Sequence, residues 1–228
     1  MELILLLHGA IGAKDQLAGL EEKLSSTFTV HRLNFSGHGG SGYIEKCFSI
    51  KLFADDVLNY LDKKKITSVS VFGYSMGGYV ALYLAKHHPE RIHKIITLAT
   101  KFKWDEVIAA KEINMLQAAK IEEKLPAFAI SLQKRHAPDD WKKILEKTAV
   151  MLFEMGKDNP LQKDDYLNIQ HPALLMIGDK DKMVTLEETQ EVCQTLPNGQ
   201  LSILQNTPHP IELVNTAELA EKIIAFLK

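Results

Sequence analysis

The sequence predicts an α/β protein with a mostly parallel sheet of about six strands and helices on both faces. Short unbroken apolar runs such as Leu3–Leu7 are typical of parallel strands that helices cover on both sides. Segments with apolar residues at helical spacing separate these runs. Because strands and helices alternate along the chain, we expect parallel pairing with right-handed crossover connections.

The individual elements follow in a regular order. The glycine-rich stretch 36–42 is expected to be a loop. Pro89 is expected to end the helix Met76–His87. The expected strands are Leu3–Leu7, Thr29–Phe35, Ser68–Phe72, Lys94–Ala99, Ala173–Ile177 and Leu201–Gln205. The expected helices outside the middle of the chain are Lys14–Leu24, Ile50–Leu61, Met76–His87, Leu186–Leu196 and Thr216–Leu227.

One interval breaks this alternation. About 70 residues without a convincing strand separate Thr100 from His171, whereas connections in α/β units are usually about 2–6 residues long. The interval predicts two helices instead, Trp104–Ile121 and Asp139–Met155. We expect residues 101–170 to form a helical lid between the two parts of the core, 1–100 and 171–228, because ligands of such sheets bind beyond the carboxyl ends of the strands. A helical subdomain that only stabilises the fold is the alternative.

The overall composition bounds the possible functions. The 228 residues suffice for one domain, and the near balance of 27 basic and 29 acidic side chains argues against a nucleic-acid partner. Cys47 and Cys193 are expected to be reduced thiols. No segment approaches the ~20 apolar residues of a membrane span, and Leu3–Leu7 is too short for a signal peptide. We therefore expect a cytoplasmic protein, and the composition leaves its oligomeric state open.

A candidate nucleophile lies between an expected strand and an expected helix. Residues 73–77 read Gly-Tyr-Ser-Met-Gly, which fits the strand–turn–helix context of a nucleophile elbow. Side chains in place of Gly73 and Gly77 would clash across so tight a turn. A phosphate-binding loop is the alternative, but the chain has neither Gly-x-Gly-x-x-Gly nor Gly-Lys-Ser/Thr. The motif therefore predicts Ser75 as a nucleophile.

A serine nucleophile requires a base and an acid that orients the base. Asp179 and Asp181 follow the expected strand Ala173–Ile177, and His209 follows the last expected strand. The carboxyl ends of parallel strands share one edge of the sheet, so these groups are expected to meet near Ser75 in the order serine, aspartate, histidine. The chain has nine histidines, and His209 is the one that follows the last expected strand. No His-Glu-x-x-His pair or Cys/His cluster occurs, so we expect no metal site.

With these residues in place, the sequence resembles the α/β-hydrolase superfamily over essentially its whole length. Residues 178–184 match the family's acid motif Gly-Asp-x-Asp-x-x-Val, whose second aspartate corresponds to Asp181; Asp179 is the alternative. His209 matches the family histidine, with Glu212 at the usual place downstream. The resemblance implies a catalytic triad of Ser75, Asp181 and His209.

The resemblance extends to the loops beside the elbow. His8-Gly9-Ala10 resembles the family's His-Gly-x turn, which implies an oxyanion hole formed by the backbone N–H groups of Ala10 and Met76, with His8 bracing the loop. Residues 37–41 resemble the Gly-His-Gly-x-Ser loop. The sequence departs from the family at its start, where the usual first hairpin is expected to be missing, and at Asn34 and Pro208, where aspartate and glycine are common.

The resemblance implies cofactor-free acyl transfer on a small-molecule acyl substrate. A serine nucleophile argues against epoxide hydrolases and haloalkane dehalogenases, which resemble this fold but use aspartate. Carboxylic ester hydrolysis is favoured because it requires least beyond the triad. Thioesterases, lactonases, C–C bond hydrolases, perhydrolases and MenH-like lyases remain alternatives, as does a non-catalytic ligand-binding protein on the same scaffold.

The lid is expected to set substrate specificity. Four residues next to the motifs are candidates for the substrate pocket, although packing in the core or a loop is an equal alternative for each: Ile11, Tyr74, Phe102 and Met183. Trp104 or Trp141 of the insertion is expected to join them.

Overall fold

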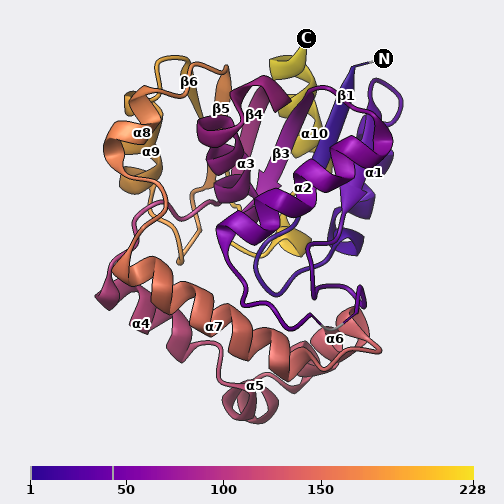
Figure 1. Cartoon of the computed structure of the whole chain (residues 1–228), viewed down its shortest axis with the longest axis vertical. Coiled ribbons are helices and arrows are strands. Elements are labelled where there is room, and N and C mark those ends of the chain that lie inside the picture. Colours follow the sequence, from indigo (N-terminus) through magenta and orange to yellow (C-terminus); the bar gives the residue numbers. More distant parts are fainter. Residues whose placement is uncertain (1, 43) are drawn as a thin grey trace.

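A central sheet of six parallel strands organises the molecule (Figure 1). The computed structural model describes residues 2–42 and 44–228. The strands lie in the order β2-β1-β3-β4-β5-β6, and all five adjacent pairs are parallel. Their bounds are β1 Leu3–Leu7, β2 Thr29–Leu33, β3 Val69–Tyr74, β4 Ile92–Leu98, β5 Ala173–Gly178 and β6 Gly199–Leu204. The predicted fold class is confirmed.

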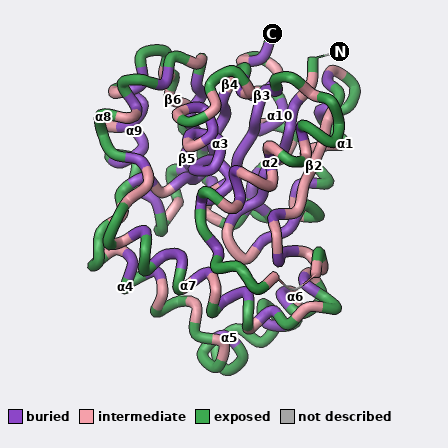
Figure 2. The backbone as a smooth tube through the Cα atoms, in the orientation of Figure 1, coloured by how far each residue is buried: buried purple, intermediate pink, exposed green. Residues whose placement is uncertain are grey.

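Helices cover both faces of the sheet. One face carries α1 (Ala18–Leu24) and α10 (Thr216–Leu227), and the other carries α2 (Ile50–Lys64), α3 (Met76–His87) and α9 (Leu186–Thr195). Successive residues of β1 pack on opposite sides, with Ile4 and Leu6 in one apolar cluster and Leu5 and Leu7 in the other. Figure 2 shows that the strands are buried along most of their length. Burial on both faces explains the unbroken apolar runs in the sequence.

A helical insertion connects β4 to β5. Its helices are α4 (Glu106–Asn114), α5 (Ala118–Lys124), α6 (Pro126–His136), α7 (Trp141–Lys157) and α8 (Lys163–Leu167). Helices α4 to α7 lie together at the end of the sheet where the strands finish (Figure 1). The single helix expected over Trp104–Ile121 is two helices, because α4 ends at Asn114, whose Oδ1 accepts hydrogen bonds from Gln117 Nε2 and Lys120 Nζ, both at 2.8 Å.

The last part of the insertion packs on the core instead. Helix α8 lies against α9, and Leu161, Tyr166 and Ile169 join the apolar cluster that contains Leu175 of β5. The helices over the strand ends are therefore α4 to α7. Within the described residues, no helix combines the length and the apolar character that crossing a bilayer requires.

Candidate active site

Ser75 lies in a sharp turn between β3 and α3, in a backbone conformation that residues other than glycine rarely adopt. Its φ is 50° and its ψ is −117°. The Ser75 N–H donates to the Leu98 carbonyl at 2.8 Å, and its carbonyl accepts from Thr100 Oγ1 at 2.9 Å. A Cβ at Gly73 would lie 2.3 Å from the Gly77 carbonyl carbon. The surrounding backbone thus imposes the strained turn that the motif predicts.

Asp181 and His209 form a hydrogen-bonded pair beside this turn. His209 Nδ1 lies 2.8 Å from Asp181 Oδ2, while Asp181 Oδ1 accepts from the N–H groups of Met183 at 2.8 Å and Val184 at 2.9 Å. Burial alone would raise the pKa of the Asp181 carboxyl, but the hydrogen bonds from His209 and the two backbone N–H groups hold the pKa below its usual value. Asp181 is therefore a carboxylate at neutral pH that fixes the orientation of the imidazole.

The structure separates the two candidate acids. The side chain of Asp181 is 1% exposed and contacts His209, whereas Asp179 is exposed and accepts a hydrogen bond from the Thr207 N–H at 3.1 Å. Tyr74 also positions the histidine, because its hydroxyl donates to the His209 carbonyl at 3.0 Å. Burial raises the pKa of Tyr74, so this hydroxyl remains a donor.

The two candidate oxyanion donors are the backbone N–H groups of Ala10 and Met76, residues that line the cavity with Ser75. Met76 is the first residue of α3, so its N–H has no acceptor within the helix. Ala10 lies in the loop after β1, and within the described residues no acceptor lies against its N–H. The Gly9 carbonyl belongs to the same peptide as that N–H and accepts hydrogen bonds from His8 Nδ1 at 2.8 Å and from the Gly12 N–H at 3.1 Å. Both candidate oxyanion donors are therefore held in fixed peptides.

Three buried histidines support this loop. His8 Nε2 accepts from the Phe35 N–H at 3.2 Å, and burial lowers the pKa of His8 to about 4, so the ring is neutral. In α6, His136 Nε2 lies 2.9 Å from the Ile11 carbonyl oxygen, and His136 Nδ1 accepts a hydrogen bond from the Gly39 N–H. His38 packs between them, with ring centroids 5.2 Å from His8 and 5.9 Å from His136. No local pattern predicts the role of His136, since its partners are 125 and 97 positions away in the chain.

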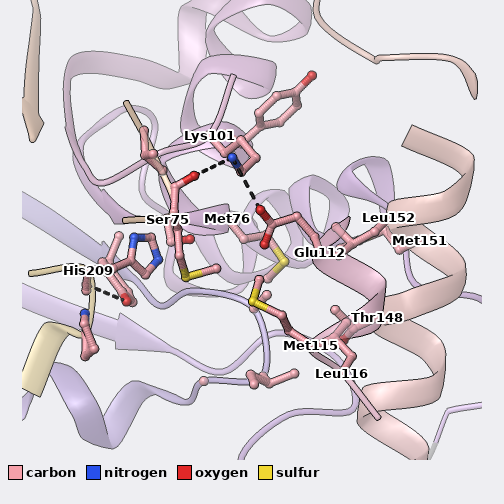
Figure 3. Close-up of a pocket in the computed structure, with 18 of the residues that line it drawn as sticks. Ser75, Met76, Lys101, Glu112, Met115, Leu116, Thr148, Met151, Leu152 and His209 are labelled. Atoms are coloured by element: carbon pink, nitrogen blue, oxygen red, sulfur yellow. Dashed lines mark hydrogen bonds and ion pairs between the residues drawn. The ribbon is translucent and has the colours of Figure 1, made fainter. Parts of the chain in front are cut away.

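A cavity of about 410 Å³ joins the sheet edge to the insertion (Figure 3). Ala10, Ser75, Met76 and His209 line it from the strand ends, and the His209 ring is directed toward Ser75 in Figure 3. Five of the seven methionines of the chain also line it: Met76, Met115, Met151, Met155 and Met183. The remaining apolar lining from the insertion is Trp104, Leu116, Ile121, Leu125, Phe128 and Leu152. The methionine lining is a feature that sequence reasoning missed, because its members are scattered along the chain.

Most, but not all, of the residues expected in the substrate pocket line this cavity. Ile11, Tyr74, Met183 and Trp104 line it. Trp141 packs instead in a separate apolar cluster of the insertion, with Leu132 and Leu145.

The structure also corrects the placement of Phe102. This side chain is 2% exposed and packs edge-to-face on Tyr166, with ring centroids 6.1 Å apart. Its N–H donates to Glu188 Oε1 at 2.5 Å, which turns the residue toward the core. The preceding residue, Lys101, lines the cavity instead.

Comparisons with known proteins agree with this architecture. The sequence profile described as alpha/beta hydrolase fold matches residues 2–155, more than half of the chain. The chain belongs to the α/β-hydrolase fold family. A curated relative, the pimeloyl-(acyl-carrier protein) methyl ester esterase of Neisseria meningitidis serogroup C, is 24% identical over 226 residues, covering 90% of this chain and 86% of its own.

Solved structures show the same fold. A thermophilic esterase from Thermogutta terrifontis with bound malate is 21% identical with a TM-score of 0.79, covering 100% of this chain and 89% of its own. MenH from S. aureus is 22% identical with a TM-score of 0.80, covering 99% of this chain and 93% of its own. At these identities the similarity establishes the fold and leaves the choice of reaction to the site.

Proposed function

We propose that this chain is a serine hydrolase that cleaves a small carboxylic ester through an acyl-enzyme intermediate. The observation that carries the proposal is the meeting of three features at one cavity. Ser75 occupies a strained turn with φ of 50°, and His209 is hydrogen-bonded to the buried Asp181 at 2.8 Å. Ala10 and Met76, whose N–H groups are the candidate oxyanion donors, line the same cavity. Nucleophile, oriented base and oxyanion donors are the parts that acyl transfer requires.

In the first step, Ser75 Oγ attacks the ester carbonyl carbon as His209 Nε2 takes the hydroxyl proton. The carbonyl oxygen becomes an oxyanion that accepts hydrogen bonds from the N–H groups of Ala10 and Met76. In other enzymes, loss of one such donor costs roughly 2.7–4 kcal/mol of transition-state stabilisation. The tetrahedral intermediate then collapses, the C–O bond to the alcohol breaks, and the imidazolium of His209 gives its proton to the leaving alkoxide.

In the second step, water replaces the alcohol. His209 removes a proton from the water as its oxygen attacks the acyl carbon, and the proton returns to Ser75 Oγ when the ester bond to the serine breaks. Asp181 keeps the Nδ1 proton of His209 in place and stabilises the imidazolium in both steps. These residues complete the cycle without a cofactor.

The cavity lining supports an apolar acyl group as the substrate. Methionine side chains are flexible and adapt to irregular apolar shapes, and five of them line the cavity. Exposed apolar residues on α4 to α6 border the opening, among them Leu125 at 56% and Phe128 at 38% exposure. We propose that α4 to α7 act as the lid that admits this group. The Neisseria relative is a methyl ester esterase, which supports an ester over the other acyl substrates.

Two measurements on the purified chain test the proposal. We expect hydrolysis of short and medium p-nitrophenyl esters and covalent labelling by a fluorophosphonate probe, with both lost in Ser75→Ala. Labelling that persists in Ser75→Ala would contradict the assignment of Ser75 as the nucleophile. A folded protein that neither labels nor cleaves esters or thioesters would favour the ligand-binding alternative, and cleavage of thioesters alone would favour a thioesterase.

A further inference from the structure

The largely apolar cavity has two ion pairs on its wall, Arg135–Glu212 and Lys101–Glu112, and in the second pair both side chains are mostly buried. Lys101 Nζ is 3.5 Å from Glu112 Oε1, and the two side chains are only 15% and 6% exposed. Lys101 follows β4, whereas Glu112 lies on α4 of the insertion. Both residues line the cavity with Ser75, and in Figure 3 they lie on the other side of Ser75 from His209. The pair therefore faces the space that the substrate would occupy.

The buried carboxylate of Glu112 is poorly satisfied. Glu188 is buried to the same extent and accepts hydrogen bonds from the N–H groups of Phe102 at 2.5 Å and Lys103 at 2.7 Å. Across residues 2–42 and 44–228, no donor other than Lys101 lies within bonding distance of Glu112. Buried charged groups normally have both a charge partner and hydrogen bonds. The comparison indicates that Glu112 has acceptor capacity left for a ligand.

Lys101 has donor capacity left as well. Its ammonium group donates one hydrogen bond, to the Met183 carbonyl at 2.5 Å, and forms an ion pair with Glu112 at 3.5 Å, although an ammonium group has three N–H donors. Together the two side chains present donor and acceptor capacity on the wall of the cavity that Ser75 lines. Their opposite charges largely cancel, so the pair gives little net attraction to a substrate carboxylate or ammonium and suits a neutral polar group better.

We propose that Lys101 and Glu112 form a recognition subsite for a neutral polar group of the acyl chain that offers both a donor and an acceptor. A hydroxyl or a secondary amide meets this requirement, with its oxygen on Lys101 and its O–H or N–H on Glu112. The subsite rests on the proposed ester hydrolysis and narrows its substrate to acyl groups that carry such a function a few atoms from the scissile carbonyl.

A set of three p-nitrophenyl esters of equal chain length tests the subsite: hexanoate, 3-hydroxyhexanoate and N-acetyl-β-alaninate. After correction for intrinsic reactivity with hydroxide, we expect the wild-type kcat/KM to favour at least one polar ester at least tenfold over hexanoate. The preference should fall about tenfold or more in Lys101→Met and in Glu112→Leu, because a hydrogen bond to a charged group is worth roughly 1.5–3 kcal/mol. The more affected polar ester identifies the hydroxyl or the amide as the preferred group.

The control pair is Lys103 and Glu191, an ion pair on the surface with side chains 55% and 44% exposed. Lys103→Met should keep the preference. The double variant Lys101→Met/Glu112→Leu leaves no unpaired buried charge, so it serves if a single variant fails to fold. No polar preference in the wild type, or an equal loss on all three esters in the double variant, would overturn the subsite and leave a purely structural tether between α4 and the core.

A binding measurement separates this proposal from the catalytic one. Calorimetry with methyl N-acetyl-β-alaninate and methyl 3-hydroxyhexanoate on Ser75→Ala reports the subsite without turnover. We expect at least one to bind about tenfold more weakly when Lys101→Met is added, and unchanged affinity for both would contradict the subsite. If the wild type cleaves no ester but this difference is found, the proposed hydrolysis fails and the subsite stands.

Discussion

The two walls of the cavity differ in how they are built. The sheet wall consists of Ala10, Ser75, Met76 and His209, which follow strand ends and are fixed by backbone geometry and hydrogen bonds. The helical wall belongs to the insertion, and most of it is held by apolar packing: Leu116, Ile121, Met151, Leu152 and Met155, with the more exposed Met115 beside them. Among the buried polar atoms of the insertion, Trp104 Nε1 and Thr148 Oγ1 belong to residues that line the cavity and have no hydrogen-bond partner within the described residues.

The two walls meet two different requirements, the chemistry of acyl transfer and the binding of the acyl chain. Acyl transfer needs reacting groups placed to within a fraction of an ångström, which strand ends and a strained turn provide. Binding a flexible acyl chain needs a surface that adapts, which methionine and leucine on helices provide. We therefore expect substitutions on the sheet wall to act on kcat and those on the helical wall to change substrate preference.

The largest effect is expected from Ser75→Ala, which removes the nucleophile from the sheet wall. Loss of a triad serine in other enzymes lowers kcat by roughly 10⁶-fold, and we expect at least about 10⁴-fold here on p-nitrophenyl butyrate. Alanine keeps the Cβ and hence the cost of the positive φ, so the unfolding midpoint should stay close to that of the wild type. A loss below tenfold would show that the sheet wall does not carry the chemistry.

Asp181→Asn should have the next largest effect. The amide cannot accept the Nδ1 proton of His209 in the geometry seen, and the corresponding change in another triad lowers kcat about 10⁴-fold. Asp179→Asn is the matched control, because Asp179 is exposed and bonds only the Thr207 N–H. We expect kcat within about threefold of wild type for the control. Equal losses in both variants would reopen the assignment of the acid.

The free energy of unfolding should decrease as the pH is lowered, because buried His8, which braces the sheet wall, is neutral in the folded protein. Burial lowers the pKa of His8 to about 4, from 6.5, so the unfolded chain takes up a proton first as the pH drops below about 6.5. The stabilisation is complete above pH 6.5 and is lost as the pH falls toward the folded pKa. Urea unfolding should show a loss of about 2–3 kcal/mol from His8 between pH 7 and 4.5.

The matched variants isolate this contribution. His8→Asn should be less stable at pH 7 and should lose less further stability on acidification, while His93→Asn, at an exposed position, should keep the wild-type slope. The same slope in His8→Asn and in the wild type would show that His8 does not titrate as its burial requires.

The smallest effect is expected on the helical wall. Met115→Trp adds volume where α4 ends, at a side chain 46% exposed that lines the cavity. We expect the preferred p-nitrophenyl ester to shift to a shorter acyl chain, with kcat/KM for octanoate relative to acetate lowered about fivefold to tenfold. Val107→Trp, on the same helix at 79% exposure and outside the lining, should leave the chain-length profile unchanged. A uniform loss on all chain lengths would contradict the division of roles between the walls.

Sequence reasoning was most successful where structure depends on local pattern. Apolar runs buried on both faces predicted six strands in order, and the glycines around Ser75 predicted the elbow, because both signals lie within a few neighbouring residues. It was less successful in the insertion, where one expected helix is divided at Asn114. Phe102 was a pocket candidate with core packing as an equal alternative, and it lies in the core, where its ring packs on Tyr166, which is distant in the sequence.

The sequence by itself determined the parallel sheet, the strained position of Ser75 and the order in which Asp181 and His209 follow their strands. These depend on backbone sterics and on the pairing of strands that the apolar pattern specifies. Only the tertiary structure decided between Asp179 and Asp181, placed His136 on the Ile11 carbonyl, and assembled five methionines with Lys101 and Glu112 around one cavity. The physical reason is that these contacts join helices of the insertion to strand ends far away in the chain, so no local pattern encodes them.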